Sequence, residues 1–326
     1  MRKIIALTAA AGLLVTLAAC STSAPSGECA PAVPSGDASS IVTATGAFGA
    51  SPAAEFPTPT IATGVEATTL TVGTGATVFE GQYADTQVTL YDGESGQFLN
   101  STSYESSAGF AVRAGEGAGN LGAAITCRTV GSRIAVAANG SDLYGFAGIA
   151  EGSIPADATF IVVFDIQDVV LGKAYGVDQV PQQGMPAVVT TPDGVPGVTV
   201  PNENPPAGLK VNVLKQADGD TLAEGDIIYA HYLRVDWSDP QSISSTKSTW
   251  ADFGNPELMT LAPLDATSGV GVTAGLLQAL VGQKVGSQVL VVVPPSFGFP
   301  DGATVPDGVD SSSTLVYVID ILGVVK

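Results

Sequence analysis

The segments VGSRIAVAANG at Val130–Gly140 and TFIVVFDIQDVV at Thr159–Val170 decide the fold of this chain, because both occur a second time. VGSQVLVVVPP at Val285–Pro295 and TLVYVIDILGVV at Thr314–Val325 repeat them, and each pair is separated by 155 residues. Two motifs that keep one spacing indicate a tandem of two homologous units. The chain has 326 residues, which is enough for two domains that each bury a core.

A third pair of motifs indicates where the two copies differ. TVFEGQ begins at Thr77 and TLAEGD at Thr221, so these motifs are 144 residues apart. The difference between 155 and 144 places 11 additional residues inside the second copy.

The apolar segments predict mostly strands. They are short and rich in β-branched residues, as in DIIYAHYLRV at 226–235, and Gly, Pro, Asp and Ser bound them. Within 274–283 the spacing is helical instead, with apolar side chains at Leu276, Leu277, Leu280 and Val281. We therefore expect an α+β fold of two domains, each a curved antiparallel sheet packed on one short helix.

The first twenty residues have the features of an export signal. A positive start is followed by an apolar run at 4–19, which is short for a membrane-spanning helix of about 20 residues. Leu17–Cys20 resembles a bacterial lipobox, which implies cleavage before Cys20, a lipid on that cysteine and a location at the extracytoplasmic face of the cell membrane. A transmembrane anchor or a plain secretory signal is the alternative.

Two other cysteines, Cys29 and Cys127, remain once Cys20 carries the lipid. An exported chain permits a disulfide between them, and two unpaired thiols are the alternative. A single histidine, His231, and the absence of clustered thiols argue against a metal site. The formal net charge of −19 argues against a nucleic-acid partner, because phosphates would be repelled.

We expect five consecutive segments along the chain. The weak alternation of SSIVTATGAFG, beginning at Ser39, allows an additional strand upstream of the first unit. The prolines that follow Val180, beginning with Pro181, Pro186 and Pro192, predict a connection that is partly extended. The expected division is a lipoprotein signal at 1–20, a tether and N-terminal segment at 21–60, the first unit at 61–175, a Pro/Gly-rich connection at 176–208 and the second unit at 209–326.

The second unit resembles FKBP-type peptidyl-prolyl isomerases over nearly its whole length. Five segments follow the family's order: its His-Tyr strand, its Phe-Asp-Ser-Ser segment, its pocket helix and following turn, its Pro-Pro strand end with an aromatic loop, and its closing strand. In this chain these segments are GDIIYAHY at 225–232, KSTW at 247–250, GLLQALVGQKVGS at 275–287, VVVPPSFGF at 291–299 and STLVYVIDIL at 313–322.

The resemblance implies rotation about X-Pro bonds in an apolar pocket, with no cofactor. The implied catalytic walls are Tyr232, Leu276, Phe299 and Tyr317. Further substrate-binding positions implied by the family motifs are Thr246, Lys247, Val272, Thr273 and Val305.

Three of these positions depart from the family. Thr246 stands where the pocket phenylalanine is expected, Lys247 where the buried aspartate is expected, and Phe299 where the loop tyrosine is expected. A carboxylate from Asp239 or Asp252 is the alternative source of the missing charge. We therefore expect weak or unusual isomerase activity.

In the first unit the same offsets give Val88 for Tyr232, Val162 for Tyr317, Leu121 for Leu276 and Tyr144 for Phe299. Because two aromatic walls are lost, we expect a degenerate FKBP-like domain with a thinned pocket. Such a unit would bind a ligand, act as a spacer or stabilise the rest of the chain.

The expected function is a lipid-anchored, extracytoplasmic, monomeric prolyl isomerase that assists folding of exported proteins. Proline-containing exported polypeptides and macrolides are the partners that the resemblance implies. A non-catalytic peptide-binding or chaperone lipoprotein is the alternative, and a solute-binding lipoprotein is disfavoured by the scarcity of helices. We expect His231 to be a surface residue without a catalytic role, and Trp250 to be either a core residue behind the pocket, which we favour, or a lip residue.

Overall fold

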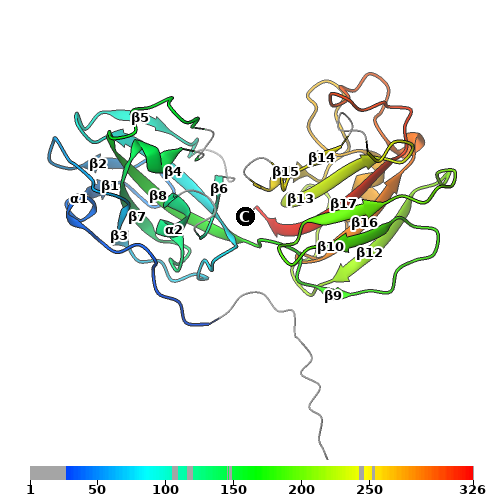
Figure 1. Cartoon of the computed structure of the whole chain (residues 1–326), viewed down its shortest axis with the longest axis horizontal. Coiled ribbons are helices and arrows are strands. Elements are labelled where there is room, and N and C mark those ends of the chain that lie inside the picture. Colours follow the sequence, from blue (N-terminus) through cyan, green and yellow to red (C-terminus); the bar gives the residue numbers. More distant parts are fainter. Residues whose placement is uncertain are drawn as a thin grey trace, which may run out of the picture.

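The computed structural model describes residues 27–104, 109–115, 120–144, 146, 149–241, 246–251 and 254–325. Figure 1 shows two bodies side by side, each built on a β-sheet. All strand pairs within these sheets are antiparallel. No helix in the described part of the chain is both long and apolar enough to cross a membrane.

The first unit contains a six-stranded sheet of order β3-β7-β8-β4-β5, with β6 also paired to β4. Its helices are α1 (Asp37–Ser40) and α2 (Asn120–Ile125). Its strands are β1 (Thr43–Thr45), β2 (Ala53–Glu55), β3 (Glu66–Thr71), β4 (Tyr83–Asp92), β5 (Phe98–Ser101), β6 (Phe110–Arg113), β7 (Arg133–Asn139) and β8 (Thr159–Val170).

The second unit contains a seven-stranded sheet of order β14-β13-β17-β16-β12-β9, with β15 also paired to β13. Its α-helix is α3 (Ala274–Leu280). Its strands are β9 (Val177–Asp178), β10 (Ala187–Thr190), β11 (Pro196–Thr199), β12 (Lys210–Gln216), β13 (Ile227–Asp236), β14 (Lys247–Ser248), β15 (Glu257–Thr260), β16 (Gln288–Val293) and β17 (Leu315–Val324).

The strand registers of the two units agree with the sequence offsets. Val88 pairs with Phe164 in the first sheet and Tyr232 with Ile319 in the second, so both offsets are kept. A bulge at Gln167 of β8 shifts its pairing with β4 after Asp85, and the equivalent bulge at Leu322 of β17 shifts its pairing with β13 after Tyr229. Because a slip of one residue would turn every side chain to the other face, this agreement makes the residue equivalences secure.

The additional residues of the second unit lie in two places. Asn100 pairs with Leu90 as Lys247 pairs with Arg234, and Phe110 pairs with Thr86 as Glu257 pairs with Ala230. Asn100 and Lys247 are 147 residues apart, as are Phe110 and Glu257, whereas Val88 and Tyr232 are 144 apart. Three residues are therefore inserted between β13 and β14, and the other eight lie between β15 and α3.

Helix α3 packs closely on β16. Leu276, Ala279 and Leu280 are buried, and a Cβ on Gly275 would come within 2.8 Å of a methyl carbon of Val293. The helix ends at Leu280, and Gly282 follows with a φ of 86°. The predicted stripe is therefore shorter than expected: Val281 lies beyond the helix and is partly exposed.

The back face of each sheet, opposite α2 or α3, is covered by a two-stranded hairpin. Strands β1 and β2 pair Thr43 with Glu55, and β10 and β11 pair Ala187 with Thr199, so the offset of the upstream motifs holds here as well. Val188 and Val198 of the second hairpin pack on β13, β16 and β17. Ordered structure thus lies inside the expected tether and the expected connection.

Cys29 and Cys127 form a disulfide with their Cα atoms 5.4 Å apart. The predicted pairing is confirmed. It ties the segment before α1 to the turn that follows α2, across 98 residues of sequence.

The two units contact each other through a small apolar cluster of Tyr83, Ala111, Val170, Tyr229 and Leu322. The backbone N–H of Leu171 donates to the carbonyl oxygen of Leu322 at 3.1 Å. Val325 packs on the same cluster, so the C-terminal end of the chain lies between the two bodies (Figure 1).

Candidate active site

An apolar cluster lies between α3 and the front face of the second sheet, where we predicted the pocket. Tyr232 on β13, Tyr317 on β17 and Leu276 on α3 are buried together in it. The rings of Tyr232 and Tyr317 are tilted, with centroids 6.3 Å apart. Alternation along β13 explains this placement, since Ile228, Ala230 and Tyr232 share the face that packs against α3.

Of the remaining predicted pocket positions, two lie at this cluster and Val305 does not pack on it. Val272 belongs to it, and Phe299 packs against it together with Phe297. Thr273 precedes α3, and its Oγ1 is buried with no hydrogen-bond partner among the described residues. In the loop before β17, Val305 is half-buried, and Val309 is the residue of that loop that packs on the cluster.

Glu257 and Lys247 form a polar cluster beside Tyr232, which we call the polar corner. The Tyr232 hydroxyl donates to Glu257 Oε2 at 2.9 Å, and Lys247 Nζ lies 2.5 Å from Glu257 Oε1. The same ammonium group lies 5.6 Å from the centroid of the Tyr232 ring, within the range of a cation–π contact. Burial, followed by the Glu257 charge, raises the pKa of the Tyr232 phenol, so this hydroxyl stays a donor at neutral pH.

The source of the carboxylate differs from our expectation. Glu257 supplies it from β15, whereas Asp239 is exposed and Asp252 lies outside the described residues. Lys247 therefore does not turn the site cationic, because its charge is paired with Glu257. Thr246, half-buried, directly precedes β14. The sequence signal for Glu257 was weak, because β15 is short and the insertions shift it by three residues relative to its equivalent.

Comparison with known proteins places this site in a family. Residues 219–322 match the model of the FKBP-type peptidyl-prolyl cis-trans isomerases. Residues 219–322 are an FKBP-type domain. All four predicted wall residues, and Glu257 with them, lie within this matched segment.

Three relatives illustrate the similarity. An FK506-binding protein of Streptomyces anulatus is 25% identical over 130 residues, which cover 40% of this chain and 96% of that protein. The structure of the three FKBP domains of wheat FKBP73 is 17% identical, with a TM-score of 0.29, and covers 81% of this chain and 95% of its own. FkpA from Escherichia coli is 21% identical, with a TM-score of 0.29, covering 44% and 52%.

His231 and Trp250 lie on the opposite face of the FKBP-type domain from the cluster of Tyr232, Tyr317 and Leu276. His231 is 1% exposed, so our expectation of a surface histidine was wrong. Its ring stacks on Trp250, with centroids 4.8 Å apart, and Trp250 packs against the apolar cluster on the back face of the sheet. Burial, and secondarily the charge of Arg113, lowers the pKa of His231 to about 4.

A chain of hydrogen bonds links the first unit to the FKBP-type domain through His231. The Tyr83 hydroxyl donates to the carbonyl oxygen of Gly254 and therefore accepts from His231 Nε2, 3.1 Å away. His231 Nδ1 then accepts from Thr249 Oγ1 at 2.8 Å, and that oxygen accepts from the backbone N–H of Tyr232 at 2.9 Å. The bonding pattern requires a proton on Nε2, and the lowered pKa of His231 keeps the imidazole neutral near pH 7.

Tyr83 therefore holds the segment that carries the polar corner. Gly254 lies between β14, which begins at Lys247, and β15, which begins at Glu257. A side chain of the first unit thus contacts Gly254, which lies between the two strands that carry Lys247 and Glu257. Neither strand periodicity nor the repeat offsets indicate this contact, because it depends on how the two units dock.

The FKBP-type domain implies peptidyl-prolyl cis-trans isomerase activity, and the site is suited to it. The barrier of about 18–20 kcal/mol to rotation of a peptide bond comes from amide resonance. Binding the prolyl amide against apolar walls removes water from it and favours the twisted state over the planar one. Such a step needs no nucleophile or proton transfer, only walls such as Tyr232, Tyr317 and Leu276.

Proposed function

We propose that this protein is an exported, lipid-anchored peptidyl-prolyl isomerase that assists the folding of exported polypeptides, with catalysis in the second unit. The observation that carries the proposal is the buried cluster of Tyr232, Tyr317 and Leu276 inside the matched segment. FKBP-type domains bind proline-containing peptides and macrolides in general. Proline-containing chains and macrolides are therefore the proposed ligands here.

The first unit is proposed to be a second FKBP-like domain without isomerase activity. Its strand order and bulges match those of the second unit. However, Val88 replaces Tyr232, and Phe110 occupies the position of Glu257. The first unit therefore has neither the phenol nor the carboxylate of the polar corner.

Export and lipid anchoring rest on the sequence of the leader and on the disulfide. Leu17–Cys20 resembles a lipobox, and a Cys29–Cys127 disulfide is stable in an oxidising compartment outside the cytosol. Incorporation of a labelled fatty acid into the wild type, and its loss in Cys20→Ala, would support the anchor. A mature protein that carries no lipid would refute it.

The catalytic assignment is tested by isomerisation of a short prolyl peptide followed directly, without a coupling protease. We expect Tyr232→Ala to lose at least tenfold in kcat/KM. Val88→Ala is the matched control, because it truncates the equivalent position of the first unit, and it should keep the wild-type rate. Full activity in Tyr232→Ala, or its loss in Val88→Ala, would show that the catalytic site has been assigned to the wrong unit.

A further inference from the structure

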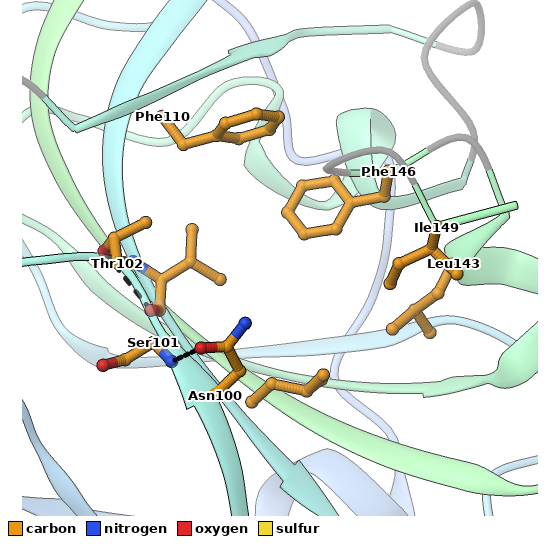
Figure 2. Close-up of a pocket in the computed structure, with 9 residues that line it drawn as sticks. Asn100, Ser101, Thr102, Phe110, Leu143, Phe146 and Ile149 are labelled. Carbon is orange, nitrogen blue, oxygen red and sulfur yellow. Dashed lines mark hydrogen bonds between the residues drawn. The ribbon is translucent and has the colours of Figure 1, made fainter. Parts of the chain in front are cut away.

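The first unit contains an apolar pocket at the position equivalent to the active site of the second unit. Its volume is about 180 Å³, and Figure 2 shows its lining side chains converging on one space from β4, β5, β6 and the segment after β7. They are Val88, Leu90, Asn100, Ser101, Thr102, Phe110, Leu143, Phe146 and Ile149. The two aromatic walls that we expected to be lost are absent at Val88 and Val162, but other residues wall this pocket.

Aromatic walls are supplied from positions that the repeat offsets did not indicate. Phe110 on β6 and Phe146 lie edge to face, with ring centroids 5.4 Å apart, and Phe146 in turn contacts Phe164 at 5.8 Å. Phe146 is buried, so its ring is held in place by the core of the first unit. The two rings form a fixed apolar wall of the pocket, opposite Asn100 and Ser101 of β5 (Figure 2).

The chemistry of this pocket differs from that of the active site at three equivalent positions. Phe110 stands for Glu257, Asn100 for Lys247 and Val88 for Tyr232, as the strand registers require. The nine lining residues drawn in Figure 2 are all uncharged. A neutral apolar ligand group fits this site, whereas an isolated charge would be buried without a partner.

The size and surroundings of the pocket indicate what occupies it. An apolar cavity of about 150 Å³ admits one benzene-sized group, so this pocket accepts a single aromatic or branched aliphatic side chain. It borders β5, the last strand of its sheet, on which Leu99 is 45% exposed, whereas Phe98 packs on Tyr91 at the back face. An edge strand with adjoining apolar surface suits an extended polypeptide, because the ligand backbone can pair along it.

We propose that the first unit binds extended, unfolded polypeptide segments by inserting one apolar side chain into this pocket, with no requirement for proline. Binding here is independent of isomerisation, because the pocket lacks the tyrosine, carboxylate and amine of the second unit. The chain then has two polypeptide-binding sites, one in each unit.

Fluorescence anisotropy of the full chain with a labelled, proline-free peptide tests this proposal. The probe is a ten-residue peptide of Ser, Gly and Ala with Leu-Phe at its centre, and a second peptide has Ser-Ser in place of Leu-Phe. We expect binding of the first peptide and at least tenfold weaker binding of the second. Equal affinities, or no binding of either, would overturn the proposal.

Two equivalent substitutions then locate the binding site. Asn100→Trp fills the mouth of the pocket and should weaken peptide binding at least tenfold while isomerisation of a short prolyl peptide is unchanged. Lys247→Trp is the matched control in the second unit and should leave the affinity for the proline-free peptide unchanged. The proposal fails if Asn100→Trp binds like the wild type, or if Lys247→Trp weakens binding as much.

A second variant guards against a failure of Asn100→Trp to fold. Ile149→Asp places a charge on the opposite wall, and circular dichroism checks that each variant retains its sheet. If both variants are folded and bind the peptide with wild-type affinity, this pocket is not a polypeptide-binding site.

Discussion

Removing the hydroxyl of Tyr83 tests whether the first unit positions the active site of the second. Tyr83→Phe deletes one oxygen atom and leaves the ring in the inter-unit cluster. It removes the partner of His231 Nε2 and of the Gly254 carbonyl oxygen. A buried polar group left without a partner costs about 1–3 kcal/mol, and a lost hydrogen bond about 0.5–1.5 kcal/mol. We expect Tyr83→Phe to weaken the free energy that holds the two units together by about 2–4 kcal/mol.

Part of that loss should be visible in catalysis. Gly254 lies in the loop between Lys247 and Glu257, so releasing it loosens the polar corner beside Tyr232. If about 1 kcal/mol of the loss reaches the transition state, kcat/KM falls about fivefold. The assay is protease-free isomerisation of a prolyl peptide, together with urea unfolding of the full chain.

Tyr91→Phe is the matched control for this experiment. The Tyr91 hydroxyl donates to Pro52 O at 2.6 Å and accepts from the Ala54 N–H at 3.2 Å, so its loss also leaves two backbone groups without a partner. Tyr91 lies on the back face of the first unit, and its variant should be destabilised but fully active. Wild-type kcat/KM in Tyr83→Phe, or an equal loss in Tyr91→Phe, would refute the positioning role of Tyr83.

Three further outcomes follow from the structure. Glu257→Gln should lower kcat/KM for prolyl peptides, because the Tyr232 phenol loses a charged acceptor worth about 1.5–3 kcal/mol; an unchanged rate would exclude a role for the carboxylate. The lowered pKa of His231, about 4 against 6.5, favours the neutral ring, so the stability it contributes is complete above pH 6.5 and is lost as pH falls towards 4, by up to about 3 kcal/mol. His231→Gln should remove that pH dependence in urea titrations, and an unaltered profile would contradict the assignment. Cys29→Ser with Cys127→Ser should lower the free energy of unfolding by up to about 4.7 kcal/mol, the loop-entropy value for about 100 residues, whereas an unchanged unfolding midpoint would show that the disulfide adds nothing.

Much of the fold was predictable because it repeats. Both sequence offsets survive as strand registers, since bulges occur at equivalent points such as Gln167 and Leu322. Short β-branched segments between turn residues indicated the strands, and the spacing of Leu276 and Leu280 indicated the helix. These signals are local, and the structure preserves them.

The residues that sequence reasoning misplaced depend on contacts between distant segments. His231 is buried because Tyr83 of the other unit docks on it, which no pattern within β13 indicates. Glu257 was missed because its strand has only four residues and follows an insertion. Phe110 was missed as a pocket wall for the same reason, since the offset that relates it to Glu257 holds only between the two insertions.

The hairpins on the back faces determine where each unit can be separated from the chain. A fragment that begins at residue 209 lacks β10 and β11, and it would expose the apolar face formed by Leu290, Val316 and Val318. Exposed apolar patches of this kind favour self-association. A fragment that begins at residue 177 keeps this cover, so the second unit is expected to remain soluble by itself only when it carries the proline-rich stretch in front of it.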